Sequence, residues 1–537
     1  MNNFPSLKNQ KSNSTKTFTT LVNGLLRSLV AEGHFLFKER KKANFMARLW
    51  PQNERLGGKA TKVFCPLHNL AEMKKPLLFL FATTSLSSLA ACGVSIGTSS
   101  STSSSTKEES TSTGPDIVKD YLKVEGEKLI DHEGKEILLR GTNLGGVFIQ
   151  ERWMDLTDSP DLLMTMNTLT AKFGREDAFD LLETFSANAL TKEDFKNLKD
   201  LGFNCLRLPI SYMDVFDCDY DLLRSDNPDP DQVYSMDMKV RYEHLEMIDN
   251  VINEAEENGM YVIIDLHGAF GSQNGQDHSI DSRQHDWLWR EDDLGDIFRQ
   301  FTLETWEVLA TRYQGYKNVA GYDLLNEPAG YRDHPECITY ETGPTQFAYF
   351  DELYKAIRAI DKNHIIIMES VWTAENLPKP SDYGWENVIY EFHHYENGGV
   401  GDDATQIRSY RNRVENILNG KFGVPLYMGE MCPHCSYEGW ETILDLFNEK
   451  GISWTSWNFK VKRVDSEWGL FNIRIDNEGD PSIPVSEVPH IVRGDDSALE
   501  IERKWGEAQR KGLYKNEGLC EVISKMAKQE YPRTNKG

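Results

Sequence analysis

The sequence has little of what several common protein classes depend on. Its eight cysteines follow no regular spacing, so it does not indicate a disulfide-stapled scaffold; they stand at positions 65, 92, 205, 218, 337, 432, 435 and 520. The C-x-x-C pair at 432–435 lacks the second half of a zinc site and indicates a local disulfide or two free thiols. A Gly-rich dinucleotide loop is also missing, so we expect neither a metal nor a cofactor.

Basic charge is scarce in most of the chain. Residues 1–91 hold 14 of the 59 Lys and Arg but only 4 of the 84 Asp and Glu, which leaves 45 basic and 80 acidic residues and a formal net charge of −35 in the remainder. Such an acidic body repels nucleic acid and anionic membranes, so we expect no nucleic-acid partner and favour a neutral one. Solubility explains the charge equally well, and charge alone does not decide between the two.

The most apolar segment, MKKPLLFLFATTSLSSLAAC at 73–92, is too short and too rich in Ser and Thr for a membrane span. Two lysines precede its apolar stretch, as in a signal peptide. Its last four residues, Leu-Ala-Ala-Cys, resemble the bacterial lipobox, in which the cysteine becomes the lipidated first residue. We therefore predict a lipoprotein signal peptide, lipidation at Cys92, and attachment to the extracellular face of a bacterial membrane. An ordinary secretory signal is the alternative.

The segments on either side of this signal differ from a folded domain. Residues 1–72 are basic and carry no motif, and we interpret them as a non-native or disordered extension before a true start at Met73. A cytoplasmic extension before an uncleaved anchor is the alternative. Residues 93–116 are rich in Ser and Thr and nearly free of large apolar side chains, which predicts a flexible linker. The folded domain is then expected over 117–537.

From residue 120 onward, short apolar runs alternate with helical patterns. The runs lie at 137–145, 203–210, 260–268, 319–328, 364–370, 387–395, 424–431 and 452–459. Helical patterns lie at 192–202, 242–259, 298–313, 350–363 and 404–420. Eight strands separated by helices predict an α/β fold, a single (β/α)8 TIM barrel. A doubly wound sheet is the structural alternative.

Polar residues cluster at the ends of these predicted strands. They are Arg207, His267, Asn326, Glu327, His393, Tyr395, Glu430 and Trp457. In a (β/α)8 barrel the carboxyl ends of the strands form one rim, which builds the active site. Any one of these residues could be a structural group at a strand end, but so many at the same rim favour a common site.

Two of the rim residues are glutamates, and a pair of carboxylates can cleave a glycosidic bond. One carboxyl protonates the leaving oxygen, and the other attacks the anomeric carbon or activates water. We expect the neighbouring carboxylate to raise the pKa of the acid, and Arg207 and Tyr395 to keep Glu430 charged. The two histidines would contact sugar hydroxyls, with a core position as the alternative for each, and Trp457 would form a flat platform for a sugar.

These motifs resemble glycoside hydrolase family 5, the cellulase-like retaining family of (β/α)8 barrels, over roughly residues 120–470. The matching stretches are NCLRLPI with Arg207, IIDLHG with His267, LLNEP with Asn326 and Glu327, FHHY with His393 and Tyr395, YMGE with Glu430, and SWTSW with Trp457. The resemblance implies that Glu327 is the acid/base, that Glu430 is the nucleophile, and that Asn326 binds a 2-hydroxyl.

Two further stretches resemble exo-β-1,3-glucanases within that family. Residues 139–154 look like their first-strand segment, in which Glu151 would hold the terminal sugar, and 267–279 look like a loop in which Asp277 would contact the sugar. The stretch MCPHCSYEGW after Glu430 and the residues after Trp457 depart from their pattern. The resemblance implies a β-glucan substrate, either β-1,3-glucan or a cellulose-like chain.

Two other functions remain open at this stage. A transglycosylase would use the same residues on the same β-glucan, and a non-catalytic glycan-binding protein would lack one of the two glutamates. The last stretch, 472–537, is interpreted as a closing addition to the barrel with no separate carbohydrate-binding module.

Overall fold

The computed structural model describes residues 120–328, 343–369, 377–462, 466–476, 480–508 and 510–532. The predicted extension 1–72, the predicted signal peptide 73–92 with Cys92, and the predicted linker 93–116 lie outside the described residues. Among the described helices, none is both long enough and apolar enough to cross a membrane. The cysteines at 205, 218, 432, 435 and 520 are all free thiols.

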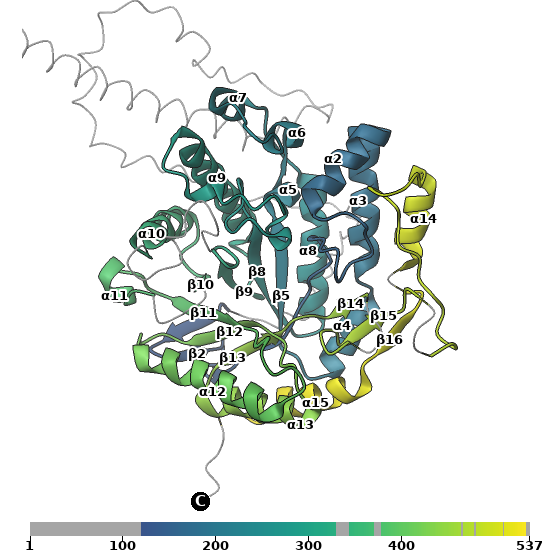
Figure 1. Cartoon of the computed structure of the whole chain (residues 1–537). Coiled ribbons are helices and arrows are strands. Elements are labelled where there is room, and N and C mark those ends of the chain that lie inside the picture. Colours follow the sequence, from purple (N-terminus) through teal and green to yellow (C-terminus); the bar gives the residue numbers. More distant parts are fainter. Residues whose placement is uncertain are drawn as a thin grey trace, which may run out of the picture. The chain divides into compact units, whose positions relative to one another are not determined.

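Eight parallel strands close into a barrel, which confirms the predicted (β/α)8 fold (Figure 1). The strands are β4 (Arg140–Asn143), β5 (Cys205–Ser211), β8 (Tyr261–Gly268), β9 (Val319–Asp323), β10 (Ile365–Glu369), β11 (Val388–His394), β12 (Leu426–Met431) and β13 (Ser453–Ser456). Seven of them fall inside a predicted run, and β5 extends one residue beyond its run, to Ser211. The barrel closes where Trp454 of β13 pairs with Arg140 of β4.

Helices surround the barrel because strands buried on both faces need an outer apolar layer. They are α2 (Leu162–Phe173), α3 (Arg175–Ala189), α4 (Lys192–Asp200), α5 (Tyr212–Val215), α6 (Tyr220–Leu223), α7 (Pro230–Ser235), α8 (Tyr242–Glu257), α9 (Asp293–Tyr313), α10 (Gly343–Ile360), α11 (Pro380–Tyr383), α12 (Asp403–Gly420), α13 (Tyr437–Lys450), α14 (Ala498–Ala508) and α15 (Glu517–Ala527), with the 3-10 turns η1 (Asp277–Ser279) and η2 (Trp287–Trp289). Each of the five helices predicted between the strands is present.

Short strands complete the fold outside the barrel. They are β1 (Lys123–Glu125), β2 (Lys128–Ile130), β3 (Glu136–Ile137), β6 (Phe216–Asp217), β7 (Lys239–Val240), β14 (Lys460–Val461), β15 (Phe471–Ile473) and β16 (Leu513–Lys515). The antiparallel β1–β2–β3 sheet precedes the first barrel strand. Leu129 of β2 and Leu122, which precedes β1, share an apolar cluster with Ile263 and Ile365. This sheet therefore closes the amino-terminal end of the barrel and leaves the other end for the site.

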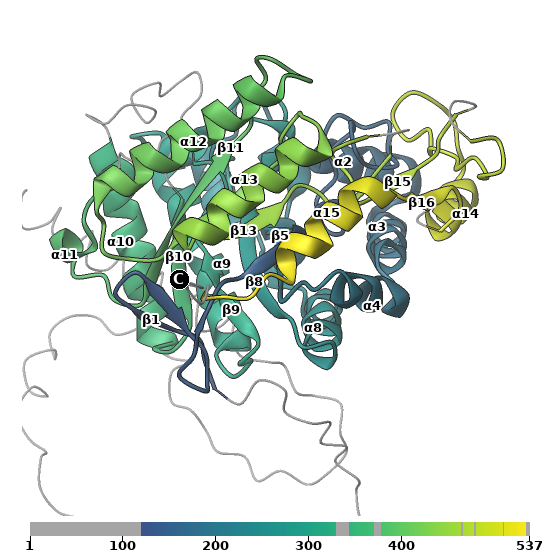
Figure 2. The ribbon, with the colours of Figure 1, turned by 90° about the horizontal axis from the view of Figure 1, so that it is seen from below.

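The C-terminal stretch packs onto the barrel as a closing layer. In the view from below, α13 lies between α12 and α15 (Figure 2). Arg140 of the first barrel strand donates from Nη1 to the carbonyl of Ala527, 3.1 Å away. Trp505 of α14 is fully buried and donates from Nε1 to the carbonyl of Leu156 at 2.8 Å. The helices α14 and α15 therefore hold the first barrel strand and the segment that follows it.

Candidate active site

A cavity of about 590 Å³ opens among residues at and beyond the carboxyl ends of the strands. Its lining consists of Glu151, Trp153, His267, His278, Asn326, Glu327, Tyr395, Glu430, Trp457 and Trp468. Seven of these were predicted from the sequence as site residues. Of the other predicted residues, Arg207 and His393 lie against the glutamates, and Asp277 lies against Glu151.

The two glutamates face each other across this cavity. One carboxylate oxygen of Glu327, one ring nitrogen of His393 and one carboxylate oxygen of Glu430 all lie within 4.8 Å of one another. Glu430 sits on β12, whereas Glu327 follows β9 with a positive φ of 41°. Residues other than glycine are rarely found in this left-handed region, and such backbone strain is concentrated at functional sites.

Arg207 organises the floor of the site as a fully buried cation. Its guanidinium lies 2.8 Å from Glu430, 2.8 Å from Asp323, 3.2 Å from Asp265 and 3.3 Å from Glu391. Burial raises the pKa of Asp323 to about 6 and, together with Asp323, that of Glu391 to about 7. Arg207 opposes both shifts. One arginine therefore neutralises part of an acidic cluster that also holds protons.

Glu430 is fixed through both of its oxygens. Arg207 donates from Nη1 to Oε1 at 2.8 Å, and the Tyr395 hydroxyl donates to Oε2 at 2.8 Å. Burial and the charge of Glu430 raise the pKa of Tyr395 well above its usual value, so the hydroxyl keeps its proton. Two donors aimed at one buried carboxyl suit a carboxylate whose orientation must be constant.

Glu327 differs from the sequence-based expectation in its charge. Burial raises its pKa, but the hydrogen bond from His393 and the nearby His278 outweigh burial and hold the pKa at about 2. Burial alone would lower the pKa of His393, and Glu369 and Glu430 raise it well above the usual value instead. The expectation that a neighbouring carboxylate raises the pKa of Glu327 is therefore wrong for the free protein. There the proton shared by Glu327 and His393 favours the imidazole.

His393 is held by carboxylates on both sides. Its Nδ1 lies 3.0 Å from Glu327 Oε1, and its Nε2 lies 3.2 Å from Glu391 Oε1. With a carboxylate oxygen at each nitrogen, the ring is placed to orient the carboxyl of Glu327, and its expected contact with a sugar hydroxyl stays a prediction.

His267 and Trp457 form a stacked pair on one wall of the cavity. Their rings lie 5.5 Å apart at an angle of 11°, and His267 Nδ1 lies 2.6 Å from Asp265 Oδ2. Burial lowers the pKa of His267 well below its usual value, so the ring is neutral and its Nε2 side is the one available to a ligand. The Trp457–Asn458 peptide bond, at the end of β13, is cis.

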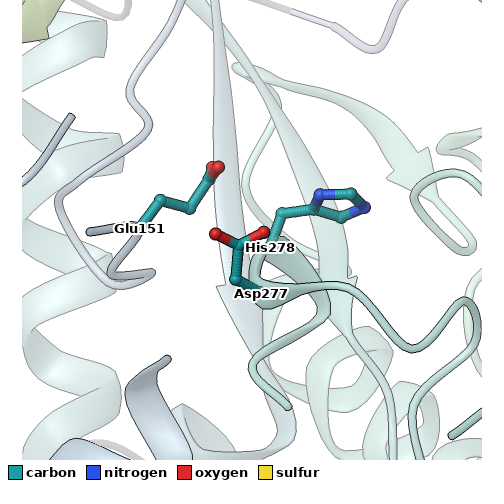
Figure 3. A group of neighbouring side chains, drawn as sticks. All are labelled: Glu151, Asp277 and His278. Carbon is teal, nitrogen blue, oxygen red and sulfur yellow. The ribbon is translucent and has the colours of Figure 1, made fainter. Parts of the chain in front are cut away.

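The far end of the cavity is lined by a second acidic group. Trp153 donates from Nε1 to Glu151 Oε2 at 2.6 Å, while Glu151 Oε1 is buried without a hydrogen-bond partner among the described residues. Glu151, Asp277 and His278 each bring one atom within 4.8 Å of the others (Figure 3). Burial and then Asp277 raise the pKa of Glu151 well above its usual value.

Several site residues were missed from the sequence. Trp153 and Trp468 line the cavity and pack edge to face at 5.1 Å, and Trp468 also contacts Tyr395 at 5.4 Å. Trp153 stands within the segment that resembles exo-glucanases, and this could have indicated it. Trp468 follows the strands in a stretch with no motif, and no sequence signal identified it.

A smaller cavity of about 200 Å³ also borders Glu327 and shares that residue and Tyr395 with the larger cavity. Its other lining residues are Glu369, His393, His394, Asn397 and Arg413. Two groups of three, Glu151 with Asp277 and His278 and Glu327 with His393 and Glu430, have the atom spacing to hold a cation. Each group includes residues that face the larger cavity, where they would meet a ligand directly.

The family model Cellulase (glycosyl hydrolase family 5) matches residues 171–463. Among curated proteins, the chain is 28% identical over 372 residues to a Beta-xylosidase of Phanerodontia chrysosporium, covering 63% of this chain and 71% of that one. It is 30% identical over 271 residues to a Probable glucan 1,3-beta-glucosidase A of Aspergillus fumigatus, covering 48% and 56%. With a Glucan 1,3-beta-glucosidase of Candida oleophila it shares 31% over 301 residues, covering 52% and 63%.

Among solved structures, the crystal structure of AoRut superposes with a TM-score of 0.49 at 16% identity, covering 62% of this chain and 91% of that one. A rutinosidase from Aspergillus niger gives a TM-score of 0.46 at 16% identity, covering 62% and 92%. The chain thus spans between about half and three quarters of the length of the curated relatives that it matches.

Proposed function

Because the chain belongs to glycosyl hydrolase family 5, it is a glycoside hydrolase, and we propose that it cleaves β-glucan with retention of anomeric configuration. Family membership confirms the resemblance seen in the sequence. Two of the curated relatives carry glucan 1,3-beta-glucosidase in their names, which favours β-1,3-glucan over a cellulose-like substrate.

One observation carries this proposal, namely the spacing of the two glutamates. Retaining glycosidases hold their carboxyl groups about 5–5.5 Å apart, whereas inverting enzymes leave about 6.5–9.5 Å for a water molecule. Oxygen atoms of Glu327 and Glu430 lie within 4.8 Å of each other, which is below the spacing of the inverting enzymes. The spacing therefore supports direct attack on the sugar by one of the two carboxylates.

The contacts of the two glutamates divide the roles between them. Glu430, held by Arg207 and Tyr395, attacks the anomeric carbon and forms a glycosyl-enzyme bond. Glu327 protonates the glycosidic oxygen as the carbon–oxygen bond breaks. In the second step Glu327 takes a proton from water, whose oxygen displaces Glu430 from the sugar. Tyr395 and Arg207 stabilise the negative charge that returns to Glu430.

The lining of the cavity supports binding of a terminal sugar. Asn326 accepts from Arg207 at Oδ1, 3.0 Å away, so its NH₂ end is free to meet a 2-hydroxyl. Glu151 and Asp277 at the far end provide acceptors for sugar hydroxyls, and Trp153, Trp457 and Trp468 provide flat apolar walls. This lining favours release of single sugars from a chain end.

The catalytic roles are tested by replacing each glutamate. Glu430→Ala should abolish turnover, and azide should restore it with a product of inverted configuration. Glu327→Ala should spare substrates with good leaving groups far more than substrates with poor ones. Full activity of Glu430→Ala on any aryl β-glucoside, or of Glu327→Ala on an aryl β-glucoside with a poor leaving group, would refute the assignment.

The substrate is tested with a panel of laminarin, cellulose, mixed-linkage glucan, xyloglucan and mannan, with product lengths resolved. Release of glucose alone from laminarin would support the proposal. Longer products from acceptor sugars would instead favour a transglycosylase, for which the smaller cavity beside Glu327 is the candidate acceptor site. Binding without turnover would indicate a glycan-binding protein.

We also propose that the protein is exported and held at the bacterial cell surface through a lipid on Cys92, as the lipobox-like sequence predicts. Fractionation of cells that express the full chain should recover it with membranes and should show labelling by a fatty-acid analogue. Cys92→Ala should abolish the labelling. Equal labelling of both forms would refute the anchor.

A further inference from the structure

The acid Glu327 stands in a turn whose backbone adopts an uncommon conformation. Its φ of 41° lies in the left-handed region, which residues other than glycine rarely enter and which persists only where surrounding groups hold it. Strand pairing does not supply that hold, because β9 ends at Asp323. Asn326 still donates from its backbone N–H to the carbonyl of Leu266 at 3.2 Å, but the next N–H, that of Glu327, needs a different acceptor.

Three side chains hold the backbone of this turn. Gln273 donates from Nε2 to the carbonyl of Asn326 at 2.9 Å, and Asn274 donates from Nδ2 to the carbonyl of Glu327 at 3.1 Å. The N–H of Glu327 donates to Oε2 of Glu369. The loop that follows β8 thus holds the two carbonyls, and of these three side chains only Glu369 holds the N–H.

The position of Glu369 follows from the pairing of the barrel strands. It is the last residue of β10, whose Ile367 pairs in parallel with Asp323 at the end of β9, so its side chain stands beside the residues that follow β9. Glu369 is 2% exposed. Its Oε1 lies 3.5 Å from His393 Nδ1, farther than the 3.0 Å between that nitrogen and Glu327 Oε1. The imidazole therefore bonds to the acid and only faces Glu369.

The contact between Glu369 and the turn depends on the reach of the side chain and not on its charge. A carboxyl oxygen accepts from an N–H whether the group is ionised or protonated. A buried N–H that loses its acceptor is costly, and the turn escapes that cost by moving away from its left-handed conformation. Such a movement displaces the carboxyl of Glu327, and a general acid acts only within hydrogen-bonding reach of the oxygen that it protonates.

We propose that Glu369 is a positioning residue for the acid. By accepting from the N–H of Glu327, it keeps the backbone of that residue left-handed and so aims the carboxyl at the glycosidic oxygen. This inference rests on the proposed function of Glu327 as the acid, and it adds a residue that the mechanism above does not use. Glu369 itself exchanges no proton with the substrate.

The test separates the length of the side chain from its charge. Glu369→Asp keeps a carboxyl but is one methylene shorter, whereas Glu369→Gln keeps the length and loses the charge. On phenyl β-glucoside, a substrate with a poor leaving group, Glu369→Asp should lower kcat/KM about 30-fold, less than the roughly 10²–10⁴-fold that a general acid contributes in full. Glu369→Gln should stay within about threefold of the parent protein, because its carbonyl oxygen accepts the same N–H.

The second substrate is 2,4-dinitrophenyl β-glucoside, whose leaving group departs without a proton. On it, both variants should retain the kcat/KM of the parent protein. All rates are compared on the plateau of the pH profile, so that a change in titration does not enter. Glu369→Ala, where it folds, should behave as Glu369→Asp does.

Met368→Ala is the matched control for a general loosening of β10. Met368 precedes Glu369 and, because side chains alternate along a strand, lies on the other face, in an apolar cluster with Ile366. This variant should lower the thermal unfolding midpoint and leave the ratio of the two kcat/KM values unchanged.

Equal losses on the two glucosides in Glu369→Asp, or no loss on either, would overturn the positioning role. A loss in Glu369→Gln as large as that in Glu369→Asp would overturn it as well, because charge and not reach would then be decisive. If Glu327→Ala keeps its selective loss on the phenyl substrate, either failure concerns Glu369 alone. If Glu327→Ala shows no such selectivity, the proposed function fails and the inference fails with it.

Discussion

At the scale of single residues, the carboxyl of Glu327 is controlled by the imidazole at its Oε1. His393 is 3.0 Å away, and its pKa lies well above the usual value because Glu369 and Glu430 outweigh burial. Two groups this close share their proton and titrate as a pair. Below that raised pKa the pair holds the proton that the acid must donate, and as pH rises through it the proton is lost.

We therefore predict that His393→Gln moves the basic limb of kcat/KM to lower pH. Without the imidazole the proton must reside on Glu327 itself, whose pKa rises from about 2 when the hydrogen bond from His393 is lost. The ordinary value of a carboxyl lies below that of a histidine, so the proton is then released earlier as pH rises. Profiles measured on phenyl β-glucoside check this. A basic limb that stays in place would contradict the shared proton.

The sequence identified those site residues whose neighbours in the chain form a recognisable motif. Glu327 follows Asn326, and Glu430 follows Gly429 near the end of a strand-like run, so both were identified. Glu369 and Glu391 touch the same imidazole but lie inside strands, where sequence offers only an apolar pattern. The downward pKa shift of Glu327 could not be predicted, because it depends on the distance to His393 and not on residue type.

At the scale of elements, the turn that carries Glu151 is closed by a buried aspartate. Asp155 accepts from the backbone N–H of Glu151 at Oδ2, 2.7 Å away, and its own N–H donates to the carbonyl of Glu151 at 2.8 Å. A Cβ at Gly146 would stand 2.1 Å from Asp155 Oδ1, so this close approach requires glycine. The turn therefore holds Glu151 and Trp153 in place against the cavity.

We predict that Asp155→Ala raises KM about tenfold and leaves kcat nearly unchanged, because it loosens the group that binds the sugar and not the groups that react. It should also lower the free energy of unfolding by about 1–3 kcal/mol, since the N–H of Glu151 loses its partner. Asp155→Asn keeps an acceptor oxygen and should have a smaller effect on both. A loss confined to kcat would contradict the assignment.

A second buried contact ties β14 to the helical layer. Lys460 donates from Nζ to Asp194 Oδ2 at 2.8 Å and to the carbonyl of Ala189 at 3.0 Å. Asp194 also accepts from the N–H of Thr191, 2.8 Å away, in the capping box that begins α4. Burial lowers the pKa of Lys460, and the neighbouring Asp194 opposes this shift.

Asp194→Ala should therefore lower the free energy of unfolding by about 3–5 kcal/mol, because it leaves a buried cation without its partner and removes a cap. Asp194→Asn retains the cap and should cost less. Urea unfolding followed by tryptophan fluorescence measures both. A change below that of a typical surface substitution in the alanine variant would show that the pair contributes nothing.

The barrel strands were predictable because an alternation of buried runs and helices has few solutions. Every barrel strand overlaps a predicted run. The ends differ: β5 continues one residue further, to Ser211, and β9 ends at Asp323 and leaves Glu327 in the following loop. The helices α2 and α3 and the β14–β15–β16 sheet were not predicted. They are additions to the barrel, which the alternating pattern of a (β/α)8 fold does not require.

At the scale of the whole molecule, the barrel strands and the cavity lie within residues 140–468. We predict that a chain beginning at residue 117 retains kcat/KM and its thermal midpoint when compared with the full sequence. The reason is that the segments before it are predicted to be an extension, a signal and a linker. A large loss of activity would contradict this division of the chain.

Removal of the C-terminal stretch should have the opposite result. Trp505 is fully buried and donates a hydrogen bond to the carbonyl of Leu156. Arg140 of the first barrel strand donates one to the carbonyl of Ala527. Loss of one large buried aromatic costs about 3–5 kcal/mol, and the whole native state of a typical domain is stable by only about 5–15 kcal/mol. A chain ending at residue 496 also loses α15, so we predict that it fails to fold, as judged by its near-ultraviolet circular dichroism and by glucoside hydrolysis. Native activity in that chain would mean that the closing layer is dispensable and that the barrel alone forms the stable unit.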